Sequence, residues 1–111
     1  MAIDLTGSPQ PQFGAQASAT TNCTQIRGNP HTSVTIYANG AIYAFNGVNE
    51  GDAAPGAPER KAYTAAQAAA GILLTFGGAV QGATYGTVCV AAQSGTVDLE
   101  AHSMPPERRA L

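Results

Sequence analysis

The chain has 111 residues, which is enough for one domain with a modest hydrophobic core. Only 11% of the residues are charged, less than half of the ~25% usual in a soluble domain, and the formal net charge of −2 argues against a general nucleic-acid-binding protein. From Ala62 to Val97 no residue is charged. Because charge normally keeps a monomer soluble and unassociated, this stretch predicts surfaces that contact other protein.

Neither a signal peptide nor a membrane-spanning segment is expected. Residues 1–5 lack the positive and apolar regions of a secretory signal. The most apolar span, Ala65 to Val80, is shorter than the ~20 residues that cross a bilayer. We therefore expect a soluble protein that is made inside the cell and has no membrane partner.

Residues 1–20 are rich in Pro, Gln, Ala, Ser and Thr, with Phe13 as the one large anchor. This composition is typical of an extended arm and not of a core. Two interpretations stay open. The arm is either a flexible terminus or a segment that orders against a neighbouring subunit, with Phe13 filling a pocket there.

The two cysteines, Cys23 and Cys89, are expected to be free, buried and apolar in a chain without an export signal, and a disulfide is the alternative. His31 and His102 have no neighbouring ligands at metal-binding spacing. We expect no metal and no other cofactor.

Alternating residues from Ser33 to Ala38, followed by Asn39-Gly40, predict a β-hairpin with a two-residue turn. This turn would pair Ala38 with Ala41, Ile36 with Tyr43, and Val34 with Phe45 on one buried face. The opposite face would present Thr35, Tyr37, Ile42 and Ala44. Since that face is only weakly polar, Tyr37 and Ile42 are candidate interface residues.

The segment Gly47 to Lys61 is predicted to be a surface loop, because it combines prolines and glycines with most of the mid-chain charge. Its acidic residues Glu50, Asp52 and Glu59 do not follow the spacing of a calcium-binding loop, so a solvated loop is expected. Next, Thr64 and Gln67 have the spacing of a capping box, and a short helix is expected to end at Gly71.

The run Ile72 to Phe76 predicts a buried strand, and Thr84 to Ser103 predicts a second hairpin around Ser94-Gly95. A two-residue turn there would pair Ala92 with Val97, Val90 with Leu99, and Val88 with Ala101 on one buried face. The outward row would hold Thr87, Cys89, Ala91, Asp98, Glu100 and His102.

The C-terminal residues 105–111 begin with two prolines, which end the strand. This segment is either a disordered tail or an arm that docks on a partner through Arg108, Arg109 and Leu111. Together these elements predict a mainly β fold, a small sandwich or barrel of antiparallel hairpins with one short helix. The expected division is an arm at 1–20, a β domain at 21–104 and a tail at 105–111.

No arrangement of residues indicates catalysis. His102 and Glu100 lie two residues apart on one strand face, where a surface pair without a catalytic role is expected and an acid–base couple is the alternative. The glycine-rich segment 77–82 lacks the Lys-Ser/Thr ending of a phosphate-binding loop. We therefore expect no enzymatic activity.

Three features resemble the capsid decoration (cement) proteins of tailed phages. They are the N-terminal arm, the strand-and-loop sequence from Ala41 to Gly47 that leads into Glu50 to Gly56, and the stretch from Thr64 to Ile72. The resemblance implies a non-enzymatic protein made in the host cytoplasm that binds the outside of an assembled capsid, often as a trimer. Its partner would be the major capsid protein or another virion protein, and the arm would add a strand to an exposed sheet edge.

Two other functions stay open. One is a different virion component, such as a head–tail connector, a tail protein or a head-fibre protein. The other is a receptor- or carbohydrate-binding β module, although the chain has no Trp and only 6% aromatic residues with which to stack on sugars.

Overall fold

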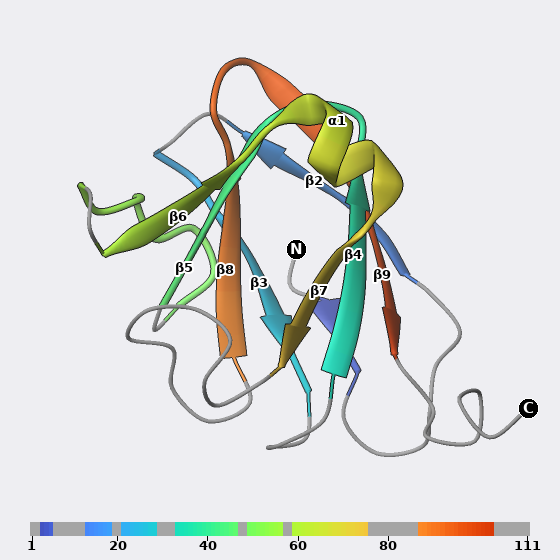
Figure 1. Cartoon of the computed structure of the whole chain (residues 1–111). Helices are drawn as coiled ribbons and strands as arrows, with labels where there is room; N and C mark the ends of the chain where they lie inside the picture. Colours follow the sequence, from blue (N-terminus) through green and yellow to red (C-terminus); the bar gives the residue numbers. More distant parts are fainter. Residues whose placement is uncertain are drawn as a thin grey trace, which may run out of the picture.

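The computed structural model describes residues 3–5, 13–18, 21–28, 33–46, 49–56, 59–75 and 87–103. Within these ranges the chain forms nine strands and one short helix (Figure 1). The elements are β1 (Ile3–Asp4), β2 (Phe13–Ser18), β3 (Thr24–Arg27), β4 (Ser33–Ala38), β5 (Ile42–Phe45), β6 (Arg60–Tyr63), α1 (Ala65–Ala70), β7 (Ile72–Thr75), β8 (Thr87–Ala92) and β9 (Thr96–Ser103). The predicted mainly β fold with one short helix is confirmed.

The strands form two sheets that face each other as a sandwich (Figure 1). Sheet 1 has the order β1-β3-β8-β5-β6, and sheet 2 has the order β2-β9-β4-β7. All neighbours are antiparallel except β1 and β3, which are parallel. In the part of the chain that is described, no helix is long and apolar enough to cross a bilayer.

The strand pairing has a simple order. Starting from the β5–β6 hairpin, each earlier strand pairs with the matching later one, β4 with β7, β3 with β8, and β2 with β9. These four pairs lie alternately in sheet 1 and sheet 2. The chain is therefore one long two-stranded ribbon wound between two sheets, which is the topology of a jelly roll.

Both predicted turns join strands of opposite sheets, so the predicted hairpin pairings are wrong. β4 pairs with β7 and β9, whereas β5 pairs with β6 and β8. Among the described glycines only Gly51, Gly71 and Gly95 have positive φ, so Gly40 lacks the backbone conformation of the expected turn. A Cβ on Gly40 would lie 2.7 Å from Cγ1 of Val97. Gly40 is therefore needed for a close approach to β9, and not for a hairpin turn.

The predicted burial is more accurate than the predicted pairing. All six residues assigned to the inner face around Ser94-Gly95 are buried, namely Val88, Val90, Ala92, Val97, Leu99 and Ala101. They belong to opposite sheets, so they contribute to one core from its two sides and not as neighbours across a ladder. Around Asn39-Gly40, Val34, Ile36 and Ala38 are buried as expected.

Ile42 is not an interface residue. Its side chain is 0% exposed and belongs to the core, as does that of Ala44. The three residues that separate β4 from β5 bring even-numbered residues inward on both strands, whereas a two-residue hairpin would have turned Ile42 outward.

A second buried cluster lies on the other side of sheet 1. It contains Cys23, Phe45, Cys89 and Ala91, and Ala54 from the following loop packs against it. The predicted outward positions Cys89 and Ala91 are therefore covered by the chain itself. The predicted loop also ends earlier than expected, because Arg60 and Lys61 pair with β5 as part of β6, and the Arg60 guanidinium lies 4.0 Å from the ring centre of Tyr43.

The N-terminal segment is not an arm where it is described. β1 pairs with β3, and β2 pairs along its whole length with β9. Ile3, Leu5 and Ala17 are buried in the core. Backbone hydrogen bonds do not depend on large side chains. The small residues of β2 therefore form a strand although their composition is typical of an extended arm.

The local signals around α1 are confirmed. The Thr64 side chain accepts a hydrogen bond from the Gln67 backbone, and the Gln67 side chain accepts one from the Thr64 N–H, which completes the capping box. β7 follows at the edge of sheet 2, with Ile72 and Leu74 inward and Leu73 61% exposed. It is therefore half-buried, and not buried on both faces as its apolar sequence predicts.

We expect Leu99→Ala to lower the free energy of unfolding by about 3 kcal/mol, because it leaves a cavity in the shared core. Leu73→Ala is the matched control and should cost less than about 1 kcal/mol, since that side chain is mostly exposed. Urea unfolding of both variants measures the difference. Equal losses would contradict the assignment of the core.

Candidate functional site

The outer face of sheet 2 is the open side of the sandwich. On β9 the alternate residues Asp98 and Glu100 are exposed and His102 is half-buried, while their neighbours point into the core. On β4 the outward residues include Thr35 and Tyr37, and Tyr37 is 37% exposed. The alternation of each strand thus places acidic and aromatic side chains on one face.

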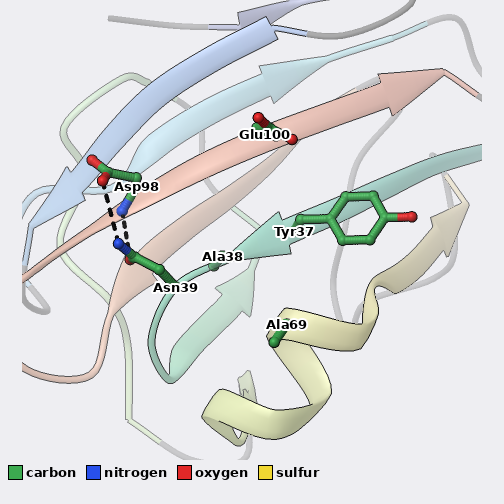
Figure 2. A pocket seen from close by; sticks show the side chains of 6 residues that line it. All are labelled: Tyr37, Ala38, Asn39, Ala69, Asp98 and Glu100. Carbon is green, nitrogen blue, oxygen red and sulfur yellow. Dashed lines mark hydrogen bonds between the residues drawn. The ribbon is translucent and has the colours of Figure 1, made fainter.

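Asp98 is held by side chains on both sides. Its two carboxylate oxygens accept hydrogen bonds from the Gln16 amide at 3.0 Å and from the Asn39 amide at 3.2 Å. The Asp98 N–H donates to Oδ1 of Asn39 at 2.9 Å, and Figure 2 shows this bond beside the one from the Asn39 amide. The Asn39 N–H donates to the Asp98 carbonyl at 3.3 Å. Asn39 therefore fixes the crossing from β4 to β5 against β9.

Glu100 has a more open environment than Asp98. In the strand register it lies opposite Tyr37 on one side and Gly14 on the other, and Gly14 has no side chain. The Glu100 side chain is 56% exposed, and its Oε1 lies 3.5 Å from Nε2 of His102. The His102 ring meets the Tyr37 ring edge-on, with centroids 5.2 Å apart.

A shallow hollow of about 350 Å³ lies between β4, β9 and α1. Tyr37 lies between Glu100 and Ala69 in it, and the Asp98–Asn39 pair closes one end (Figure 2). The lining residues are Tyr37, Ala38, Asn39, Ala69, Asp98 and Glu100. The position of the Tyr37 ring depends on Gly71, because a Cβ there would lie 2.9 Å from Cε1 of the ring.

Beside the hollow, the exposed surface of α1 and β7 is uncharged. We call this the α1–β7 surface, and it consists of the exposed residues Ala65, Ala66, Ala69, Ala70 and Leu73. A second hollow of about 420 Å³ runs along it, lined by Lys61, Tyr63, Gln67, Ala70, Gly71, Ile72 and Leu73. Tyr37 and Leu73 are the large hydrophobic residues that are exposed within the described ranges.

The predicted site residues divide into three groups. Tyr37 is exposed as expected, and Ile42 is in the core. Phe13 pairs through its backbone with Ala101, and its side chain lies outside the described residues, as do Arg108, Arg109 and Leu111. Strand alternation predicted that Asp98 and Glu100 point outward, but no local signal indicated that Leu73 is exposed.

The chemistry of this face favours binding. Among the described residues, no three His, Cys, Asp or Glu side chains converge on a point where a metal ion would bind. The face offers the Tyr37 and His102 rings, two carboxylates, amides and small apolar side chains. Groups of these kinds are able to form hydrogen bonds and apolar contacts, and the carboxylates are able to form charge-assisted bonds with basic groups.

Comparison with known proteins gives information on the fold alone. No family model and no curated protein matches the chain. Among solved structures, the chain is similar to a de novo designed double-stranded β-helix, with a TM-score of 0.55 and 10% sequence identity. The match covers 86% of this chain and 100% of the designed one. This similarity agrees with the wound-ribbon topology and transfers no function.

We expect Asn39→Ala to lower the free energy of unfolding by about 1 kcal/mol, because Asp98 loses a donor and its N–H loses an acceptor. Asn22→Ala is the control, because the exposed Asn22 side chain donates its hydrogen bond to the adjacent Thr21. This substitution should change the free energy of unfolding by less than about 0.5 kcal/mol. Thermal and urea unfolding of the two variants compare these losses. If Asn39→Ala left the free energy of unfolding unchanged, the connection from β4 to β5 would not depend on the Asn39–Asp98 pair.

Proposed function

We propose that the chain is a non-enzymatic virion structural protein that binds and stabilises an assembled phage head, as a capsid decoration protein does. Its partner is the major capsid protein or another virion protein, and copies of the chain associate with one another, with a trimer favoured. The protein is made in the host cytoplasm and ends on the capsid surface. The sequence resemblance and the α1–β7 surface support this proposal.

The single observation on which the proposal depends is the exposure of Leu73 beside the uncharged surface of α1. Leu73 is 61% exposed on an edge strand, next to the exposed alanines of α1. Small, uncharged side chains let another protein approach closely, and depletion of charge is typical of the centre of protein interfaces. An edge strand also offers unpaired backbone groups, which a partner strand is able to use.

The topology gives weaker support. Jelly rolls occur in viral capsid domains, but also in lectins and cupins. Fold class alone therefore does not decide the function.

A carbohydrate-binding module is the second candidate, and the hollow beside Tyr37 favours it. An aromatic ring next to exposed carboxylate and amide groups resembles the mix of apolar and polar contacts that orients small ligands. The hollow is shallow, however, and one tyrosine offers little stacking area. Glycan binding by the isolated protein, lost in Tyr37→Ala, would favour this candidate over the first.

The proposed function is tested on the virions whose genome encodes the chain. After purification on a density gradient, quantitative mass spectrometry should find the chain in the head fraction at a fixed ratio to the major capsid protein. Particles from which the gene has been deleted should rebind the purified chain from solution. Absence of the chain from purified virions would contradict the proposal.

The contact surface is tested by placing polar side chains on it. We expect Ala69→Glu and Leu73→Gln to weaken rebinding to the deleted particles at least about tenfold, because each places a polar group in a desolvated contact. Ala53→Glu is the control, since Ala53 is exposed on the loop that covers sheet 1. Co-sedimentation measures binding, and circular dichroism verifies that each variant is folded. Equal binding by all three variants would show that the α1–β7 surface does not contact the particle.

A further inference from the structure

The second buried cluster contains a pair of thiols that the proposed function does not use. Cys23 is 2% exposed and Cys89 is 0% exposed, and both are free. Cys23 lies immediately before β3, whereas Cys89 lies on β8. In the register, Cys89 is opposite Gln25, and Cys23 precedes Gln25 by two residues. The two side chains are therefore diagonal neighbours on the same face of sheet 1.

Both thiols contact the same backbone atom. Each sulfur lies 3.7 Å from the carbonyl oxygen of Asn49, so the two sulfur atoms are at most twice 3.7 Å apart. Cys23 lies just before the first residue of β3, so its backbone is not part of the β3–β8 ladder. Diagonal positions have Cα atoms about 7–8 Å apart and a disulfide usually needs less than about 7 Å, so the bond requires a shift of the backbone at Cys23.

The turn that covers this pair gives the two thiols different surroundings, and their pKa values shift in opposite directions. The Cys23 N–H donates to the Asp52 carbonyl at 3.0 Å, and the Gly51 N–H donates to the Cys23 carbonyl at 3.0 Å. Gly51 has a φ of 87°, which turns successive N–H groups toward the cysteine. Hydrogen bonds from the Cys89 thiol and from the N–H groups of Gly51 and Asp52 lower the pKa of Cys23, against the effect of burial. The Cys23 thiol and burial raise the pKa of Cys89.

We propose that Cys23 and Cys89 form an oxidation site, in which Cys23 reacts with a peroxide and Cys89 completes an intramolecular disulfide. The Cys23 thiolate attacks one oxygen of hydrogen peroxide, the O–O bond breaks, and a sulfenic acid forms. The released hydroxide takes up the proton that the Cys23 thiol had lost and becomes water. The Cys89 sulfur then attacks the Cys23 sulfur, the S–S bond forms, and the S–O bond breaks. The hydroxyl leaves with the Cys89 proton as a second water.

The site is closed in the reduced protein, so access depends on the turn. The segment 49–52 must open before peroxide reaches Cys23, and such local opening is far less costly than global unfolding. The Asn49 N–H donates to Oδ2 of Asp52 at 2.8 Å and holds the turn shut. Asp52→Ala should therefore speed oxidation several-fold.

The disulfide would join the start of β3 to β8 and restrict the unfolded chain between residues 23 and 89. We expect the melting temperature to rise by roughly 10 °C. For a virion that leaves a reducing cytoplasm for an oxidising medium, this bond would strengthen the protein after release. That last consequence depends on the proposed function, whereas the oxidation site itself does not.

The test uses the purified, fully reduced chain and hydrogen peroxide alone. The expected product is a monomer that has lost two hydrogen atoms and both free thiols, with a Cys23–Cys89 link found by peptide mapping without reduction. Reduction with dithiothreitol should restore the starting mass and melting temperature. Disulfide-linked dimers, a sulfinic acid at Cys23 with Cys89 still reduced, or no reaction while the urea-unfolded chain reacts would each overturn the proposal.

Two serine variants test the separate roles. In Cys89→Ser, Cys23 should stop at the sulfenic acid and be labelled by dimedone. In Cys23→Ser, the oxidation of Cys89 should be at least about tenfold slower than thiol loss in the wild-type chain. Equal rates in the two variants would overturn the assignment of Cys23 as the attacking thiol. If a variant folds poorly, peptide mapping of the oxidised wild-type chain still shows whether the disulfide forms.

Discussion

The whole structure depends on the backbone pairing of one two-stranded ribbon. Its four pairs alternate between the sheets, and the β4–β9 and β5–β8 ladders join them side by side. Every connection from β2 to β9 except the β5–β6 hairpin must then cross from one sheet to the other. Strands that follow each other in sequence thus contribute to the core from opposite sides, as Val90 and Leu99 do. The helix α1 occupies one of these crossings, between β6 and β7 (Figure 1).

This constraint explains which parts of the fold the sequence predicts. Alternation reports which side chains are buried, and that is the same whether two strands are hydrogen-bonded neighbours or face each other across a core. The inward residues around Ser94-Gly95 were therefore predicted correctly while their pairing was not.

Asn39-Gly40 has the composition of a hairpin turn, but Asn39 bonds to Asp98 and Gly40 approaches Val97. Both partners are distant in sequence, so no local pattern reports them. The capping box of α1 was predicted because all its contacts are local.

The same distinction applies to the candidate site. The outward direction of Tyr37 and Glu100 follows from alternation, but their adjacency is set by the register of β4 against β9. Leu73 was missed for another reason. An apolar run is typical of a strand buried on both faces, and its exposure follows from the position of β7 at the edge of sheet 2. The shared contact of Cys23 and Cys89 with Asn49 likewise depends on a loop that folds back over sheet 1.

In the described parts of the stretch from Ala62 to Val97, the uncharged residues lie in two different environments. On β8 the uncharged residues are buried, since the core covers one face and the segment 49–56 covers the other. Those positions need no partner. On α1 and β7, Ala68, Ile72 and Leu74 are buried as well, but the residues of the α1–β7 surface are exposed. Composition alone does not distinguish these two environments, because residues buried by their own chain and residues that a partner would cover are both uncharged. Within the ranges that the structure describes, the fold separates them: the core and the segment that covers it account for the low charge of β8, and they do not account for that of the α1–β7 surface.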